Sequence, residues 1–282
     1  MDAIILQAFE NIRCGFLDFF FSIFTLLGEE FVIAGIIAVI YVCFSKDLGE
    51  RALVTVMSAS CITTGVKSAV RRLRPYAAGT VSRVDNLLTA DLDPDMSFPS
   101  GHATASGGFF AALSIKFRKA YVIAPSAVFV LLVALSRLYL GVHYPSDVLA
   151  GLAVGIGMAF VWHIVYHGFY RIRHIIYLVF AALSFILLLI PATQTESMYE
   201  ISAIALASAI GLIVEDRFIR FGNTDKWWKR GIRLGLTIAV AAIPYLLLSL
   251  LPDLLWYKFL QYFVTILVTI VGVPFLIKIF HI

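Results

Sequence analysis

Residues 121–141 read YVIAPSAVFVLLVALSRLYLG, and residues 147–167 read DVLAGLAVGIGMAFVWHIVYH. Each stretch is almost continuously apolar over about 20 residues, which is enough for a helix to cross the hydrocarbon core of a bilayer. Only residues 142–146 separate them, so the two stretches predict antiparallel membrane helices joined by a tight turn. Their apolar residues do not alternate with polar ones, which favours helices over the strands of a β-barrel.

The composition of the whole chain points the same way. Of 282 residues, 61% are hydrophobic and 14% are charged, and the mean hydropathy is +0.92, values outside the usual range for soluble domains. The formal net charge of +4 implies no nucleic-acid partner. We expect nine membrane spans: a first one that ends near Phe44, and eight more at about 52–70, 100–117, 121–141, 147–167, 174–191, 200–217, 234–251 and 258–280.

The first span is interrupted by charge. Asp18, Glu29 and Glu30 lie within the apolar run from Phe16 to Phe44, and charges are costly inside a bilayer. Residues 4–27 therefore have an alternative interpretation as an interfacial or re-entrant helix. The two glutamates either mark a membrane boundary or line a substrate path.

The basic residues between the spans predict the orientation, because Lys and Arg accumulate on the cytoplasmic side. One side collects Lys46, Arg51, Lys116, Arg118, Lys119, Arg171, Arg173, Arg217, Arg220, Lys226, Lys229, Arg230 and Arg233. The opposite side holds residues 76–98 and 192–199, in which Arg83 is the only basic residue. Five further cations lie at span ends on this outer side, where the positive-inside bias disfavours them. Their positions must therefore have a local cause: Lys67, Arg71, Arg72, Arg74 and Arg137.

Three short segments fall on that outer face. In the first, Lys67 and Arg74 are about two helical turns apart and share one face, and Pro75 ends the helix. In the second, FPSGH at residues 98–102, Ser100 is placed to cap the next helix, and Gly101 lets an anion approach the backbone closely. Alone, the first segment also suits a lipid-headgroup contact, and the second also suits a plain helix start with an interfacial histidine.

The third segment is SRLYLGVHYPSD at residues 136–147. In a compact turn, Asp147 can accept a hydrogen bond from one ring nitrogen of His143, which leaves the other nitrogen free to attack. Arg137 can meet a phosphate with a planar fork of donors. The alternative is a His–Asp pair with a purely structural role.

Taken together, the order Lys-x6-Arg-Pro, Pro-Ser-Gly-His and Ser-Arg-x5-His-x3-Asp matches the tripartite signature of the type-2 phosphatidic acid phosphatase (PAP2) superfamily. The resemblance covers about residues 45–190. It implies an all-α polytopic membrane protein with a six-helix core and about three additional C-terminal transmembrane helices. We expect an N-terminal segment at 1–30, a catalytic core at 31–192 and a C-terminal extension at 193–282. Residues 211–221 weakly resemble the extended C-terminal portion of some bacterial lipid phosphatases.

The resemblance also implies roles for the motif residues. His143 is expected to attack phosphorus and become a phosphohistidine, with Asp147 orienting it, and His102 is expected to protonate the leaving group. The expected phosphate-binding groups are Lys67, Arg74, Ser100, the Gly101 amide and Arg137.

No metal or other cofactor is expected, because these cations supply the charge that metal ions provide elsewhere. The acidic residues of the outer loop are interpreted as solvated: Asp85, Asp91, Asp93 and Asp95. Arg71 and Arg72 occupy positions that the family leaves free. Snorkelling to the interface is favoured slightly over contacts to a second phosphate.

The sequence therefore predicts an integral membrane phosphatase acting on a lipid phosphate monoester or diphosphate at the non-cytoplasmic face of a bacterial inner membrane. Phosphatidic acid, phosphatidylglycerophosphate, undecaprenyl diphosphate, lipid A and sphingoid phosphates all fit. A lipid phosphotransferase and a sugar-phosphate phosphatase of the glucose-6-phosphatase type remain alternatives. A transporter is less favoured, because it has no need for both histidines. The sequence leaves the oligomeric state open.

Overall fold

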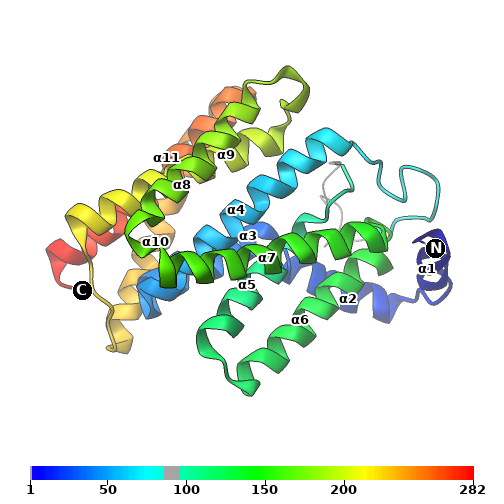
Figure 1. Cartoon of the computed structure of the whole chain (residues 1–282), viewed down its shortest axis with the longest axis horizontal. Helices are drawn as coiled ribbons and strands as arrows, with labels where there is room; N and C mark the ends of the chain where they lie inside the picture. Colours follow the sequence, from blue (N-terminus) through cyan, green and yellow to red (C-terminus); the bar gives the residue numbers. More distant parts are fainter. Residues whose placement is uncertain (1, 86–95) are drawn as a thin grey trace. The chain divides into compact units, whose positions relative to one another are not determined.

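The computed structural model describes residues 2–85 and 96–282, and the regular structure in these ranges is entirely helical (Figure 1). The chain divides into two compact units, each assembled from two stretches of sequence. Unit 1 comprises Met1–Ala34 and Ile62–His163, and unit 2 comprises Gly35–Cys61 and Ile164–Ile282.

The α-helices are, in chain order, α1 (Asp2–Asn11), α2 (Gly15–Leu27), α3 (Glu30–Val39), α4 (Lys46–Val70), α5 (Gly101–Phe117), α6 (Ala120–Tyr139), α7 (Pro145–Gly168), α8 (Arg173–Leu188), α9 (Glu196–Val214), α10 (Trp227–Leu248) and α11 (Leu255–Phe280). Two π-helical turns follow α3 and α9, at Ile40–Phe44 and Glu215–Ile219, and 3-10 turns occupy Tyr170–Ile172 and Pro191–Thr193.

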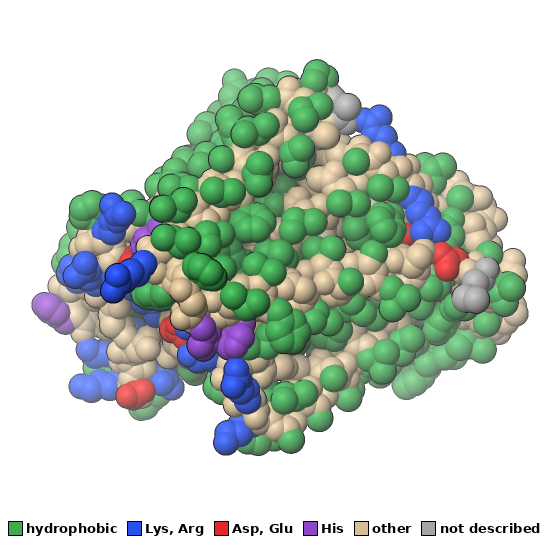
Figure 2. All heavy atoms as spheres, viewed as in Figure 1, with side chains coloured by type: hydrophobic (Ala, Val, Ile, Leu, Met, Phe, Trp, Pro, Cys, Tyr) green, Lys and Arg blue, Asp and Glu red, His purple; other side chains and the backbone are tan. Residues whose placement is uncertain are grey.

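Seven of the helices in the described ranges are long and apolar enough to cross a membrane, and the bent pair formed by Gly15–Leu27 and Glu30–Phe44 makes up to eight. The expected nine spans also included α5, which at 17 residues is short for a crossing helix. Hydrophobic side chains cover much of the face seen in Figure 2, as expected for surfaces that meet lipid. The protein is thus an all-α polytopic membrane protein, as the sequence predicts.

In unit 1, two glycines bring α7 into backbone contact with α5. A Cβ atom at Gly151 would lie 2.5 Å from the Ser100 carbonyl oxygen, and one at Gly155 would lie 2.2 Å from the Thr104 carbonyl oxygen. Small residues permit such close helix packing within membranes. The hydroxyl groups of Thr63 and Thr104, 3.0 Å apart, link α4 to α5. The ends of α4, α5 and α7 that carry the sequence motifs are thereby held together.

The turn between α6 and α7 depends on a glycine in the left-handed conformation. Gly141 has a φ of +75°, and a Cβ atom there would lie 2.4 Å from the Ser82 carbonyl oxygen. Both the backbone conformation and the lack of space exclude other residues. This turn presents His143 toward the start of α7.

The N-terminal helices pack against the end of α6. Arg13 donates from Nε and Nη2 to the Tyr139 carbonyl oxygen, at 3.1 Å and 2.9 Å. The Tyr139 hydroxyl donates to Asp18 Oδ1 at 2.6 Å. Asp18, one of the acids that interrupt the first apolar run, is therefore hydrogen-bonded within unit 1.

In unit 2, a buried ionic network links α4, α8 and the π-helical turn after α9. Arg173 lies 3.4 Å from Glu50 Oε1 and 2.7 Å from Asp216 Oδ2. Lys46 pairs with Glu215, whose side chain is 1% exposed. Paired burial of this kind avoids the large cost of isolated charge.

Replacing Arg173 by Ala should therefore destabilise the protein by about 3 to 5 kcal/mol, because Glu50 would remain buried without its cation. Thermal unfolding in detergent measures the effect. Arg171→Ala, on the exposed surface two residues earlier, is the matched control and should melt with the wild type. An Arg173→Ala variant that also melted with the wild type would contradict a stabilising role for the network.

Candidate active site

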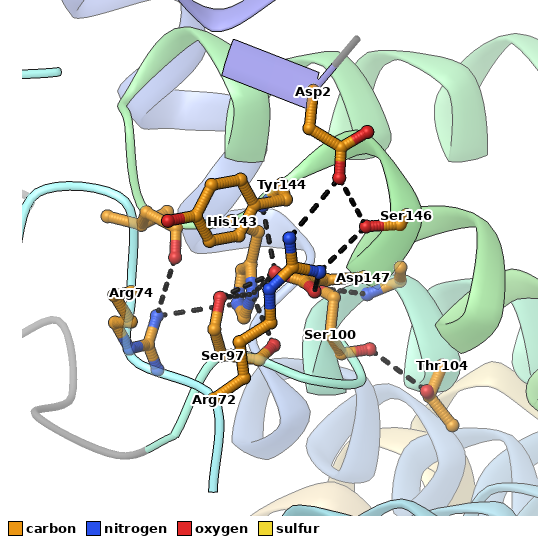
Figure 3. Close-up of polar contacts among 12 residues, drawn as sticks. Asp2, Arg72, Arg74, Ser97, Ser100, Thr104, His143, Tyr144, Ser146 and Asp147 are labelled. Atoms are coloured by element: carbon orange, nitrogen blue, oxygen red, sulfur yellow. Dashed lines mark hydrogen bonds and ion pairs between the residues drawn. The ribbon is translucent and has the colours of Figure 1, made fainter. Parts of the chain in front are cut away.

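The three motif segments meet in unit 1 (Figure 3). The first segment places Lys67 in the last turn of α4 and Arg74 just after that helix. In the second, Ser100 caps α5, which begins with Gly101 and His102. In the third, Arg137 lies in the last turn of α6, His143 in the turn that follows, and Asp147 in the first turn of α7. Residues up to about 80 positions apart in sequence thus share one end of the helices of this unit.

His143 is almost completely buried, and one nitrogen of its ring is committed to a hydrogen bond. Nδ1 lies 2.8 Å from the carbonyl oxygen of Ser97. An acceptor at this position requires the proton to be on Nδ1, which leaves a lone pair on Nε2. Nε2 lies 3.3 Å from Nη1 of Arg74. His143 therefore presents an unprotonated Nε2 next to a guanidinium.

Asp147 does not make the hydrogen bond that the sequence suggests. Its Oδ2 lies 3.6 Å from His143 Nδ1, too far for a hydrogen bond. Instead, Oδ2 accepts from the Ser97 hydroxyl at 2.5 Å and from the Tyr144 N–H at 2.8 Å. The buried carboxylate thus acts on the imidazole at short range and holds the residues around it, while the Ser97 carbonyl takes the ring proton.

Arg72 joins this group. Its Nη1 donates to Asp147 Oδ1 at 2.8 Å and to the Ser146 hydroxyl at 2.7 Å, and its Nη2 donates to Asp2 Oδ2 at 3.3 Å. The guanidinium carbon also lies 3.8 Å from the centre of the Tyr144 ring. The preference for snorkelling is wrong for Arg72, because its side chain is held by Asp147 and by the N-terminal helix α1.

The start of α5 has the form that the sequence predicts for an N-cap. The Ser100 hydroxyl accepts from the Ala103 N–H at 3.5 Å, and the Ser100 N–H donates to the Asp147 carbonyl oxygen at 3.0 Å. A Cβ atom at Gly101 would lie 2.2 Å from Glu30 Oε1. The carboxylate of Glu30 therefore lies against the bare backbone of Gly101.

Three cations concentrate positive charge near His143. Lys67, Arg74 and Arg137 are 9%, 4% and 1% exposed. Arg74 also donates to the Val142 carbonyl oxygen at 3.3 Å, and Arg137 donates to the Thr25 hydroxyl. Burial, followed by the charges of Arg74, Arg137 and Lys67, lowers the pKa of His143 well below its ordinary value. The imidazole is therefore neutral at neutral pH, and the positive surroundings suit an anionic ligand.

His102 has an acidic neighbour that the sequence does not identify as part of the site. Its Nε2 lies 3.0 Å from Oε2 of Glu29, a contact that becomes an ion pair when the imidazole is protonated. Ser97, Arg72 and Glu29 are thus three additions to the predicted site.

In the outer acidic loop, Asp85 is exposed and pairs with Arg83 at 2.8 Å. Asp91, Asp93 and Asp95 lie outside the described residues. Among the described residues, no cluster of His, Cys, Asp and Glu has the arrangement of a metal site.

Comparison with known proteins gives two family matches. Residues 50–173 match the PAP2 superfamily, and residues 199–282 match the PAP2 superfamily phosphatase transmembrane extension. The second match agrees with the weak resemblance noted for residues 211–221.

Curated relatives are lipid phosphatases. The lipid A 1-phosphatase of Rhizobium etli is 36% identical over 122 residues, covering 42% of this chain and 50% of the relative. The undecaprenyl-diphosphatase BcrC of Bacillus subtilis is 36% identical over 89 residues, covering 32% and 42%. The lipid A 4'-phosphatase of Bacteroides thetaiotaomicron is 28% identical over 168 residues, covering 55% and 72%. The chain spans about half the length of the first of these relatives.

Among solved structures, Aquifex aeolicus LpxE matches with a TM-score of 0.48 and 26% identity, covering 57% of this chain and 93% of that one. A PAP2-type phosphatidylglycerolphosphate phosphatase from Bacillus subtilis matches with a TM-score of 0.49 and 24% identity, covering 60% and 85%.

Proposed function

The chain belongs to the PAP2 superfamily, and we propose that it is a membrane phosphatase that hydrolyses a lipid phosphate monoester or diphosphate through a phosphohistidine. The observation that carries the proposal is the geometry at His143. Its Nδ1 is held by the Ser97 carbonyl, and its Nε2 is unprotonated within a cluster of buried cations. A neutral, oriented imidazole beside a site for an anion is the arrangement that nucleophilic attack on phosphorus requires.

In the first step, His143 Nε2 forms a bond to phosphorus while the bond from phosphorus to the leaving oxygen breaks. His102 gives its proton to that oxygen, so a lipid alcohol leaves from a monoester and a lipid monophosphate leaves from a diphosphate. The imidazole of His143 becomes phosphorylated and cationic. Asp147, close to Nδ1, stabilises that charge.

In the second step, water attacks phosphorus and the P–N bond breaks. Neutral His102 takes one proton from the water, inorganic phosphate leaves, and His143 returns to its neutral form. The net reaction consumes one water and restores both histidines.

The anionic oxygens of the transferred group require donors that are in place before the reaction. Lys67, Arg74 and Arg137 bring positive charge to the site, and Ser100 and the Gly101 amide add the N-terminus of α5. We propose that these groups do the work of a metal ion and that the enzyme needs no cofactor. Each role follows from the resemblance together with the positions described above.

The site is proposed to face the periplasm or the exterior. The support is the distribution of charge, because the loops on the other side carry nearly all of the basic residues outside the motifs.

We also propose a catalytic core at 31–192 and a C-terminal extension at 193–282. The separate family matches at 50–173 and 199–282 support this division.

The lowered pKa of His143 predicts the pH dependence. Since the nucleophile must be neutral, the acidic limb of kcat/KM should lie below pH 6.5, the ordinary histidine pKa. Arg74→Gln should move this limb to higher pH, because it removes a charge that lowers the pKa. Lys116→Gln, at the end of α5 remote from the motif, is the control. Ionisation of the substrate affects the wild type and both variants equally. If the acidic limb of kcat/KM lay at the same pH in Arg74→Gln as in the wild type, the assignment of this limb to His143 would be contradicted.

The function is tested by phosphate release in detergent with EDTA present. The substrates are phosphatidic acid, phosphatidylglycerophosphate, undecaprenyl diphosphate, lipid A, a sphingoid phosphate and glucose 6-phosphate. We expect EDTA-resistant release from at least one lipid. Activity abolished by EDTA would overturn the metal-free mechanism. Release from the sugar phosphate alone, or transfer of phosphate to an added lipid without free phosphate, would support the alternative enzymes.

A further inference from the structure

The break between α2 and α3 brings Glu29 to the catalytic end of unit 1. Helix α2 ends at Leu27 and α3 begins at Glu30. At the break, a Cβ atom on Gly28 would lie 2.5 Å from Cγ1 of Val133 in α6. The break therefore packs directly against α6, the helix that carries Arg137, and its position is set by this close approach.

Glu29 reaches the first turn of α5. Its Oε2 lies 3.0 Å from Nε2 of His102, and the two side chains are 30% and 13% exposed. A partly buried carboxylate that contacts one ring nitrogen stabilises the doubly protonated imidazole and fixes its orientation. The second nitrogen then carries a proton that it can donate.

The surroundings of His102 make such a partner necessary. Burial, followed by the positive charges of Arg137 and Arg74, disfavours a second proton on this imidazole. The proposed general acid must nevertheless carry a proton that it can give to the leaving oxygen when the substrate is bound. The negative charge of Glu29 acts in the opposite direction and favours the second proton.

We propose that Glu29 is a positioning residue for the general acid: it favours the protonated form of His102, so that Nδ1–H is available to the leaving oxygen when the substrate is bound. This inference rests on the proposed function. When the bond from phosphorus to oxygen breaks, the Nδ1 proton passes to the leaving oxygen and His102 remains neutral with its Nε2 proton on the Glu29 side. When water attacks the phosphohistidine, Nδ1 takes back a proton and the pair is restored.

The neighbouring residue Glu30 offers a matched comparison. Its carboxylate lies against Gly101, whereas that of Glu29 lies against His102 Nε2. Loss of its negative charge changes the electrostatics at the start of α5, where the phosphate is proposed to bind. We therefore expect Glu30→Gln to alter KM, with no dependence on the leaving group.

The test compares two leaving groups on the same enzyme. An alkyl lipid phosphate such as phosphatidic acid needs protonation of its leaving oxygen, whereas p-nitrophenyl phosphate releases a stable phenolate. Glu29→Gln should reduce kcat on the lipid by about 10- to 100-fold, because general acid catalysis, which typically contributes roughly 100- to 10,000-fold, is weakened but not removed. On the aryl ester the loss should be much smaller. His102→Asn should show the same asymmetry, and adding Glu29→Gln to it should cost little more.

Three results would overturn the inference: equal losses on both substrates, full activity of Glu29→Gln on both, or additive losses in the double variant. Glu196→Gln, an exposed glutamate at the start of α9, is the control for loss of a carboxylate. Failure of the proposed function has a different signature, since the wild type would then release no phosphate from any lipid, or His143 variants would remain active.

Discussion

Replacing His143 by Asn is expected to reduce kcat for phosphate release by at least about 1,000-fold, the scale seen when the nucleophile of a covalent mechanism is removed. The asparagine amide can still donate to the Ser97 carbonyl, which accepts from Nδ1 in the wild type. The variant therefore loses Nε2, the atom that attacks phosphorus, while the neighbouring backbone keeps its hydrogen bond.

The measurement is initial-rate phosphate release in detergent, together with trapping of radiolabelled phosphate on the protein by a rapid quench at alkaline pH. The wild type should retain an acid-labile label, and His143→Asn should retain none. His281→Asn, exposed at the end of α11, is the control for loss of an imidazole. Appreciable turnover by His143→Asn would exclude the phosphohistidine and would fit a transporter or a different nucleophile.

Much of the fold can be predicted from the sequence because membrane helices are determined by length and hydropathy. The stretches at 121–141 and 147–167 become α6 and α7 with end points that differ by a few residues. The start of the chain is harder to predict, because Asp18 and Glu29 have general explanations at a membrane boundary. Their contacts with Tyr139 and His102 arise only when distant segments meet.

The motif residues of the site are predicted because each carries a side chain with characteristic chemistry at a fixed spacing. Ser97 is missed because its main contribution is a backbone carbonyl, which leaves no trace in the sequence. Arg72 is misinterpreted because several basic residues lie at the same membrane face, and sequence alone does not show which of them turns inward to Asp147. For Glu29, charge inside an apolar run is the signal that marks the position.

Substitutions of Asp147 and Ser97 are expected to reduce catalysis to different extents. The comparison distinguishes the negative charge beside the His143 imidazole from the hydrogen bonds that orient that imidazole. Asp147→Asn removes the negative charge 3.6 Å from the imidazole that becomes cationic during phosphorylation. The single amide oxygen that remains can accept from the Tyr144 N–H and the Ser97 hydroxyl, as Oδ2 does, or from Arg72, as Oδ1 does, but not from all three. We expect kcat to fall by about 100- to 1,000-fold, as when a preorganised electrostatic group is lost from other active sites.

Ser97→Ala should cost no more than about 10-fold, the scale of one lost hydrogen bond, because the carbonyl that accepts from Nδ1 belongs to the backbone and remains. The hydroxyl contributes one of the donors to Asp147, and the Tyr144 N–H and Arg72 retain theirs. Rates of phosphate release for the two variants under identical conditions provide the comparison, and Ser249→Ala at the end of α10 is the hydroxyl control. If Ser97→Ala were as inactive as Asp147→Asn, orientation through the hydroxyl would outweigh charge, and the stabilising role assigned to the carboxylate would have to be abandoned.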